Sequence, residues 1–161
     1  MSGSADPGPA RRYAPGRLYR LENTVMTALT RAGLVPHSYV LTTHGRRTGR
    51  PRHNPVLIIE HDDRRWLVAP YGAVGWVHNA RAAGRVRLTR RRTGRDYLVR
   101  EVSGVEAGPV LQHYIQIASA TREYFATTRD DPIESFVAEA ERHPVFELLD
   151  PGTGRSTPTP I

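Results

Sequence analysis

Short apolar runs, bounded by polar or turn-forming residues, occupy the middle of the chain. They lie at residues 38–43, 55–60, 65–70, 85–90 and 96–102. Some alternate apolar with polar positions, as Val86 and Leu88 do between arginines, and this period of two is typical of half-buried strands. Polar turns at residues 61–63 and 93–94 connect neighbouring runs. Five short strands at this spacing predict an antiparallel barrel or sandwich.

Before the strands, the apolar pattern has helical spacing. Apolar residues recur three or four positions apart along residues 17–32 and form one face of a predicted helix. Gly33 stands where a left-handed C-cap belongs, and Pro36 follows it. We expect this basic amphipathic helix to pack across the open end of the barrel. The alternative is that it lies on a membrane surface as a peripheral contact.

Helical spacing returns after the strands. Residues 109–124 carry apolar side chains on one side. A second helix is predicted to start with Asp131 as its cap, because a proline in the first turn and Glu134 follow it. Residues 143–148 end that helix and are a candidate last strand. The predicted fold class is therefore α+β, with a small antiparallel barrel flanked by helices.

Length and composition allow one compact domain. The chain has 161 residues, of which 39% are hydrophobic, and no apolar stretch approaches the roughly 18 residues of a membrane-spanning helix. Residues 1–16 and 150–161 are rich in proline, glycine and small residues, and we expect them to be tails around a single domain at residues 17–149. The absence of cysteine excludes disulfides and thiolate chemistry. Without an apolar leader segment, we expect a cytoplasmic protein.

The charge balance points to an anionic partner. Lysine and arginine together number 23, all of them arginine, against 16 acidic residues, and the formal net charge is +7. The alternative explanation is a coding bias toward arginine. The sequence has no nucleophile elbow, no lysine-containing phosphate loop and no Gly-x-Gly-x-x-Gly turn. Its scattered histidines lack the i, i+4 spacing that directs two imidazoles at one ion, so no metal site is expected.

Three segments carry candidate binding chemistry. In residues 42–52, two glycines bracket arginines and a threonine, so backbone N–H and guanidinium groups can hold an anion; an exposed hairpin loop is the alternative. In residues 53–57, Pro55 is expected to break the strand ladder and leave backbone groups free for a ligand, although an ordinary edge strand explains it too. In residues 68–79, small residues precede Trp76 and Asn79. These two share one face of a predicted helical turn and can cover and hold a flat ring; a loop with one core tryptophan is the alternative.

Together these segments resemble the deazaflavin-dependent nitroreductase family, oxidoreductases of actinobacterial type that use coenzyme F-420. The resemblance rests on Thr-x-Gly-Arg-Arg-Thr-Gly-x-Pro-Arg at residues 43–52, Asn-Pro-Val at 54–56, Leu-Val-Ala at 67–69 and Gly-x-x-x-Trp-x-x-Asn at 72–79. It covers residues 38–104 well and the C-terminal helices loosely. It implies a split antiparallel β-barrel, of the kind that also binds FMN, flanked by helices.

The resemblance also implies a cofactor site. The basic loop would hold the phosphate and glutamate tail, the next strand would lie beside the ring system, and residues 68–71 would form a second wall that a closing element completes. The implied residues are Arg46, Arg47, Thr48, Gly49, Arg52, Asn54, Pro55, Val56, Leu57, Val68, Ala69, Pro70, Tyr71, Trp76 and Asn79. The chain departs from the family pattern at residues 71–75, which are short, and at Val77-His78. Both departures concern the shape of the substrate mouth.

The implied reaction is hydride transfer from reduced deazaflavin to a quinone, a nitroaromatic or an activated alkene. Because the cofactor itself donates the hydride, the chain needs no acid–base pair. Tyr114 and Tyr124 lie on the helix expected to cover the barrel mouth. They are candidate substrate contacts or proton donors, and packing is their alternative role.

Other interpretations stay open. A split barrel that binds FMN keeps the fold and changes the cofactor. A non-catalytic carrier of F-420 would share every cofactor contact. A nucleic-acid-binding module would use the arginines at 46–47 and 90–92, but no aromatic residues alternate with them as single-strand binding requires, and we expect no nucleic-acid partner. Both a monomer and a homodimer fit the sequence.

Overall fold

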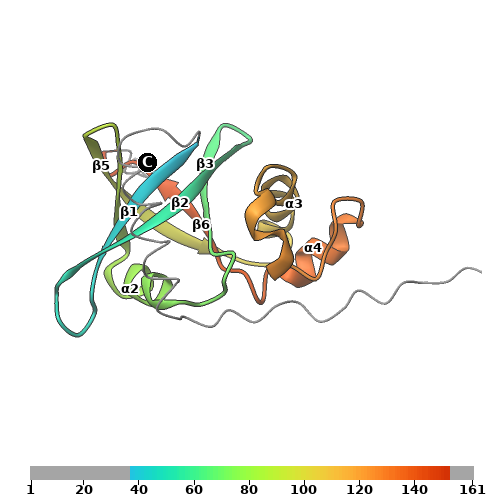
Figure 1. Ribbon diagram of the computed structural model, residues 1–161, viewed down its shortest axis with the longest axis horizontal. Coiled ribbons are helices and arrows are strands. Elements are labelled where there is room, and N and C mark those ends of the chain that lie inside the picture. Colours follow the sequence, from blue (N-terminus) through green and yellow to red (C-terminus); the bar gives the residue numbers. More distant parts are fainter. Residues whose placement is uncertain (1–36, 153–161) are drawn as a thin grey trace, which may run out of the picture.

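The computed structural model describes residues 37–152 (Figure 1). The helix expected at residues 17–32, the tail at 1–16 and all but the first three residues of the tail at 150–161 lie outside the described residues.

Six antiparallel strands close into a barrel in the order β1-β2-β3-β6-β5-β4, and β4 pairs again with β1. The strands are β1 (Ser38–His44), β2 (Pro51–His61), β3 (Arg64–Val68), β4 (Arg85–Arg90), β5 (Thr93–Val102) and β6 (Val145–Leu149). The strand expected at the C-terminal end of the chain is β6, which lies between β3 and β5. The predicted antiparallel barrel flanked by helices is therefore confirmed.

Alternation along the strands builds two apolar clusters on opposite faces of the barrel wall. Leu41, Leu67 and Phe146 belong to one cluster, together with residues of the first described helix. Trp66 and Val145 belong to the other, which the later helices cover. Because both of its faces are covered, β6 is buried along almost its whole length. This explains why its sequence reads as a nearly continuous apolar run.

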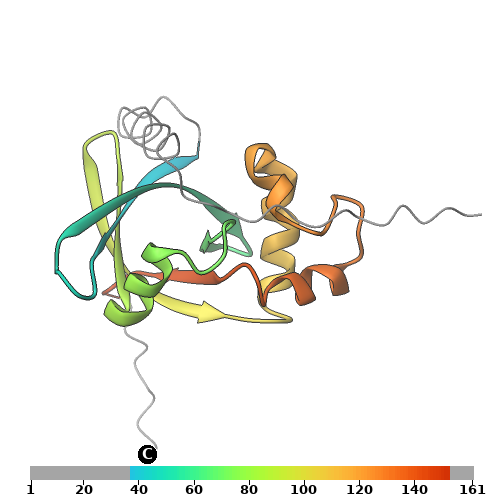
Figure 2. The same ribbon diagram turned by 60° about the horizontal axis from the view of Figure 1, so that its bottom comes forward.

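The helices divide into two groups. They are α2 (Gly75–Ala83), α3 (Ala107–Ile117), the 3-10 helix η1 (Ser119–Tyr124) and α4 (Ile133–Glu139). Figure 1 and Figure 2 show α2 against the barrel, and α3 and α4 together at one side of it. Gly108 permits the close contact between α3 and α4, because a β-carbon there would lie 2.8 Å from a methyl carbon of Val137.

Two strands are longer than the sequence indicated. β2 begins at Pro51 instead of residue 55, and Pro55 lies inside the ladder opposite Val40. The expectation that Pro55 breaks the ladder is therefore wrong. β5 begins at Thr93, because the hairpin turns at Arg91 and Arg92, whose φ angles are 47° and 65°. A two-residue turn with both φ angles positive suits the twist of the two strands, and asparagine or glycine normally occupies it. For this reason the sequence predicted the turn at Thr93-Gly94 and not at the two arginines.

The helical region also differs in detail. The helix predicted over 109–124 is divided into α3 and η1. The second helix has Pro132 at its N-cap position, without a side-chain cap. The Asp131 carboxylate instead accepts a hydrogen bond from the backbone N–H of Thr128, 2.6 Å away, so the predicted capping role is wrong.

A buried carboxylate connects α4 to the segment that follows η1. Glu139 accepts hydrogen bonds from the backbone N–H of Ala126 at 3.0 Å and from Arg142 at 2.9 Å, and one of its oxygens lies 3.0 Å from His143 Nε2. Burial opposes the negative charge. The hydrogen bonds from His143 and Ala126 outweigh that effect and lower the pKa of Glu139.

We expect Glu139→Gln to reduce the free energy of unfolding by about 1–3 kcal/mol at pH 7, because a buried set of donors loses its charged acceptor. A carboxylate whose pKa is lower in the folded chain stabilises the fold above the unfolded pKa, and this stabilisation is lost as pH falls through the folded pKa. Urea denaturation should therefore show the difference from wild type shrinking below about pH 4. Glu141→Gln, at an exposed position, serves as the control. A difference that does not change with pH would contradict the ionic role.

Candidate cofactor cleft

The loop between β1 and β2 is ordered by its own backbone. The N–H of Gly45 donates to the carbonyl of Arg50 at 2.8 Å, and the N–H of Gly49 donates to the carbonyl of Gly45 at 2.7 Å. Gly49 adopts a φ of 67°, which favours glycine, and a β-carbon at Gly45 would lie 2.7 Å from Thr48 Oγ1. The two glycines therefore fix a compact loop that presents the arginines outward. We call residues 45–50 the basic loop.

Asn79 holds the basic loop against α2. Its side-chain oxygen accepts hydrogen bonds from the backbone N–H of Arg46 at 3.2 Å and from the Arg46 guanidinium at 3.3 Å. Its amide nitrogen donates to Thr43 Oγ1 at 3.3 Å, and the side chain is buried. Asn79 therefore positions Arg46, a role that differs from the direct contact with a ring that the sequence suggested.

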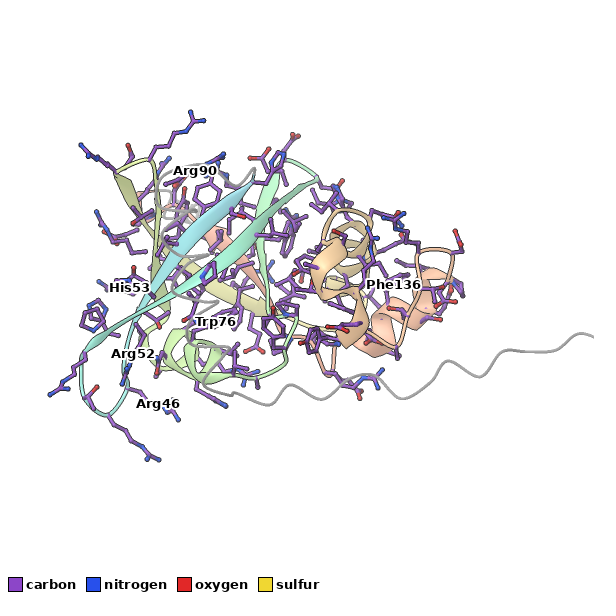
Figure 3. The ribbon with its side chains drawn as sticks, in the orientation of Figure 1. Arg46, Arg52, His53, Trp76, Arg90 and Phe136 are labelled. Carbon is purple, nitrogen blue, oxygen red and sulfur yellow. The ribbon has the colours of Figure 1, made fainter. Side chains whose placement is uncertain are left out.

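Between the basic loop, the first half of β2 and the start of α2 lies an open cleft of about 890 Å³. Figure 3 shows Arg46, Arg52 and Trp76 in this part of the molecule. The predicted site residues that line the cleft are Arg46, Arg47, Thr48, Arg52, Asn54, Trp76 and Asn79. The structure thus brings together residues of the segments 42–52 and 53–57 with two residues from the end of the segment 68–79.

The charge in the cleft is of one sign. Three arginines line it, and none of the described residues that line it is acidic. Within residues 37–152, Arg46, Arg47 and Arg52 form no ion pair with a carboxylate. In the same range, the backbone N–H groups of Arg47 and Thr48 have no carbonyl partner. The cleft can therefore offer both guanidinium and backbone donors to an anion.

The opposite wall is bare and apolar. Gly75 lines the cleft, and a β-carbon built there would meet no protein atom within 4 Å. The ring of Trp76 lies beside it, is 6% exposed, and packs 6.0 Å from the ring of Phe146. Trp76 therefore lines the cleft and belongs to the core at the same time. The sequence had left these open as alternatives, a residue that covers a ligand ring or a core tryptophan.

Several predicted residues lie elsewhere. Val68 and Ala69 are buried in the two apolar clusters, and Pro70 and Tyr71 are half-buried in the segment that leads to α2. The remaining predicted cofactor residues, Gly49, Pro55, Val56 and Leu57, lie on the basic loop or on β2 without lining the cleft. For these eight residues a role in cofactor binding stays a prediction.

The two candidate substrate tyrosines have different surroundings. The Tyr114 hydroxyl lies 3.0 Å from Thr121 Oγ1, and burial raises the pKa of the phenol. It therefore stays protonated at neutral pH and connects α3 to η1. Tyr124 is half-buried, and its ring meets that of Tyr71 edge-on at 4.8 Å. The proton-donor role stays a prediction for both.

Five cleft residues were absent from the predicted set: Gly45, Pro51, His53, Val74 and Gly75. All five are sequence neighbours of predicted residues, so extending each motif by a residue or two would have included them. His53 Nδ1 lies 2.9 Å from Thr42 Oγ1, across the paired strands.

Within the described range, no three histidine or acidic side chains lie close enough to hold a metal ion. There too, no helix is long and apolar enough to cross a membrane.

Comparison with known proteins decides the family. A model of the F420H2-dependent quinone reductase family matches residues 16–140. The chain belongs to this family. The resemblance of the sequence to F-420-dependent split-barrel reductases is thereby confirmed, and the chain is a member of an oxidoreductase family that depends on F420H2, the reduced form of F-420.

Two of three similar solved structures, the first two below, agree on the fold. One, described as a domain-swapped dimer, is 20% identical with a TM-score of 0.51, and the match covers 81% of this chain and 96% of that one. A protein of unknown function from Agrobacterium tumefaciens is 16% identical with a TM-score of 0.52, over 92% of this chain and 60% of that one. An F420H2-dependent reductase is 21% identical with a TM-score of 0.48, over 70% and 94%.

In this member of the quinone reductase family, the residues that line the cleft match the charge and the shape of the coenzyme. F-420 carries an anionic tail and a flat ring. One wall of the cleft offers three arginines that have no carboxylate partner among the described residues, and the other offers open backbone beside a tryptophan. Arg46, Arg47 and Arg52 would hold the tail. Gly75 and Trp76 would lie against the apolar part.

We expect Gly75→Leu to weaken F-420 binding about tenfold or more, because the new side chain would occupy open volume that the ligand needs. The fold should stay intact, since a β-carbon at this position meets no protein atom. Fluorescence titration and thermal melting measure the two effects. Ala82→Leu adds the same bulk at an exposed position of α2 and should leave binding unchanged. Equal binding by Gly75→Leu and wild type would exclude this wall as part of the site.

We expect Asn79→Ala to weaken F-420 binding about threefold to tenfold, because Arg46 would lose the acceptor that orients its backbone and its guanidinium. The loss should shrink when Arg46 is already replaced by glutamine, which removes the guanidinium and keeps the backbone donor, and a double-mutant cycle measures this coupling. His78→Ala, at an exposed position of the same helix, is the control. Additive losses in the cycle would mean that Asn79 does not act through the Arg46 side chain.

Proposed function

We propose that the chain binds F420H2 in the cleft and transfers a hydride to a small-molecule acceptor, with a quinone as the first candidate. One cleft of about 890 Å³ joins three arginines, which have no carboxylate partner in the described part of the chain, to an open glycine and a tryptophan, and this observation carries the proposal. A polyanionic tail and a flat ring need these two surfaces side by side. The family to which the chain belongs supports the same cofactor.

The protein's part in the reaction is to bind and orient. When bound, reduced deazaflavin supplies the hydride. The arginines of the basic loop fix the tail, so the ring is held at a constant position along the cleft. Gly75 lets the ligand approach the backbone, and Trp76 excludes water from one side. The acceptor also takes up a proton, which we assign to solvent because the cleft is open and Tyr114 is buried away from it.

A titration and an acceptor screen test the proposal. Purified protein is titrated with F-420 and, separately, with FMN while ring fluorescence is followed. F420H2 is then mixed with the protein and menadione, a nitroaromatic compound or an enone, and the return of oxidised F-420 is measured. We expect saturable binding of F-420, weaker binding of FMN, and the fastest turnover with the quinone.

Each alternative gives a different result. Preferential binding of FMN would change the cofactor and keep the fold. Binding of F-420 without turnover of any acceptor would indicate a carrier. Turnover of the nitroaromatic or the enone in preference to menadione would keep the reaction and change the acceptor class.

A further inference from the structure

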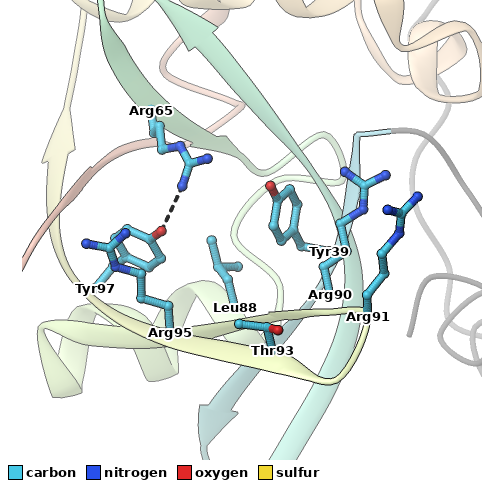
Figure 4. A pocket seen from close by; sticks show the side chains of 8 residues that line it. All are labelled: Tyr39, Arg65, Leu88, Arg90, Arg91, Thr93, Arg95 and Tyr97. Atoms are coloured by element: carbon cyan, nitrogen blue, oxygen red, sulfur yellow. Dashed lines mark hydrogen bonds between the residues drawn. The ribbon is translucent and has the colours of Figure 1, made fainter. Parts of the chain in front are cut away.

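A second cavity lies at the other end of the barrel from the basic loop. It has a volume of about 550 Å³ and is lined by side chains from β1, β3, β4, β5 and the β4–β5 hairpin. Figure 4 shows the arginines around it and the rings of Tyr39 and Tyr97 on opposite sides, with Leu88 between them. No residue lines both this cavity and the cofactor cleft. In Figure 3, Arg90 lies far from Arg46.

Four arginines give this cavity its charge, and none of its lining residues within 37–152 is acidic. Two of them have carboxylate partners: Arg65 lies 3.5 Å from Glu60, and Arg95 lies 2.8 Å from Asp150. The other two, Arg90 and Arg91, have no carboxylate partner among residues 37–152. The cavity therefore carries two positive charges that its described surroundings do not balance.

Arg90 has a further unsatisfied group. Its Nε is buried and, within the described residues, has no hydrogen-bond partner. A buried donor without an acceptor costs free energy, and a turn of the guanidinium toward an anion in the cavity would remove that cost. The guanidinium carbon lies 5.6 Å from the centre of the Tyr39 ring, which limits where the group can turn.

Leu88 and the rings of two tyrosines form apolar walls of the cavity. Leu88 and Tyr97 are buried side chains of the barrel core. The Tyr97 hydroxyl accepts a hydrogen bond from Arg65 at 2.7 Å, and the guanidinium carbon of Arg95 lies 5.6 Å from the centre of the Tyr97 ring. The rings of Tyr39 and Tyr97 are thus held as two flat walls. A concave site with apolar walls and a few convergent charges is typical of small-ligand binding.

We propose that this cavity binds a small organic anion, one that carries a phosphate or carboxylate group on a flat apolar body. The anionic group would contact the guanidinium groups of Arg90 and Arg91. The flat body would lie between the rings of Tyr39 and Tyr97, over Leu88. This site is separate from the cofactor cleft and does not depend on the function proposed there.

Phenyl phosphate and inorganic phosphate are suitable probes, because they differ only in the flat body. The full chain with Arg46→Gln and Arg47→Gln is titrated with each, so that the basic loop does not compete, and the amide signals of Thr93 and Gly94 are followed by NMR. We expect saturable shifts with both probes and at least tenfold tighter binding of phenyl phosphate. Adding Arg90→Gln and Arg91→Gln should weaken both at least tenfold.

Two controls separate the charge from the rings. Arg85→Gln with Arg92→Gln removes the same charge from positions that do not line the cavity, and it should leave both affinities within twofold of the starting variant. Tyr39→Leu should reduce the advantage of phenyl phosphate over inorganic phosphate. Absence of saturable shifts in the full chain would overturn the proposal and mean that the cavity is closed in solution. Equal affinity for the two probes would overturn the organic ligand, and equal losses in the control pair would overturn the assignment to Arg90 and Arg91.

Discussion

Replacing Arg46 and Arg47 together with glutamine is expected to weaken F-420 binding tenfold to a hundredfold. Both side chains line the cleft, and neither has a carboxylate partner in the described chain, so they are available to the anionic tail. A charge-assisted hydrogen bond contributes about 1.5–3 kcal/mol, and exposure puts these bonds toward the lower end. About 1.4 kcal/mol corresponds to one factor of ten in affinity, which gives the expected range. Fluorescence titration measures it.

Comparison of full and truncated cofactors shows where these arginines act. A deazaflavin without phosphate and glutamates should bind equally well to wild type and variant, because the contacts that the variant lacks are with the tail. The difference for full-length F-420 should shrink at high salt, where wild-type binding is already screened. Arg85→Gln with Arg92→Gln removes the same net charge from positions that line neither the cleft nor the second cavity and should have little effect. An equal loss for full and truncated cofactors would mean that the basic loop does not contact the tail.

The sequence predicted the barrel well because the barrel depends on a simple pattern. Leu41, Ile59, Leu67 and Val86 all fall in predicted strands, and all are buried. The polar half of β2 has no such pattern: residues 51–54 form a strand because the basic loop turns the chain back along β1, and not because of their own propensity. Strand boundaries set by a turn are not visible in apolar periodicity.

The candidate site could be predicted in part, and the limit is physical. The basic loop and the start of α2 are joined through Asn79 and Arg46, which are 33 positions apart, and a glycine-rich segment allows that approach. Motif spacing indicated that both belong to a site. It could not show that the Asn79 amide is already used by Arg46 and Thr43, because that depends on the geometry of three separate segments. The small residues Val68 and Ala69 suggested a ligand wall. Their burial in the core depends on the packing of separate segments, which the sequence does not show.

Replacing Trp76 with alanine is expected to reduce the free energy of unfolding by about 3–5 kcal/mol, the usual cost of removing a large buried aromatic side chain. The ring is 6% exposed and packs with Phe146 in the apolar cluster inside the barrel. The sequence left two alternatives open, a closing element with little effect on stability and a core tryptophan, and only the second predicts a large loss. Urea denaturation measures the change, and His78→Ala on the exposed side of α2 is the control. A loss below about 1 kcal/mol would contradict the packing role.

Trp76→Phe separates the two roles of this residue. Phenylalanine keeps an aromatic ring against Phe146, so the expected loss of stability falls to about 1–2 kcal/mol, and the barrel should stay folded at 25 °C. The smaller ring covers less of the cleft wall, so F-420 affinity should still fall about threefold to tenfold. If the variant instead binds F-420 like wild type while its stability falls as expected, Trp76 acts only in the core, and the wall of the cleft at this position is formed by Gly75 and Val74.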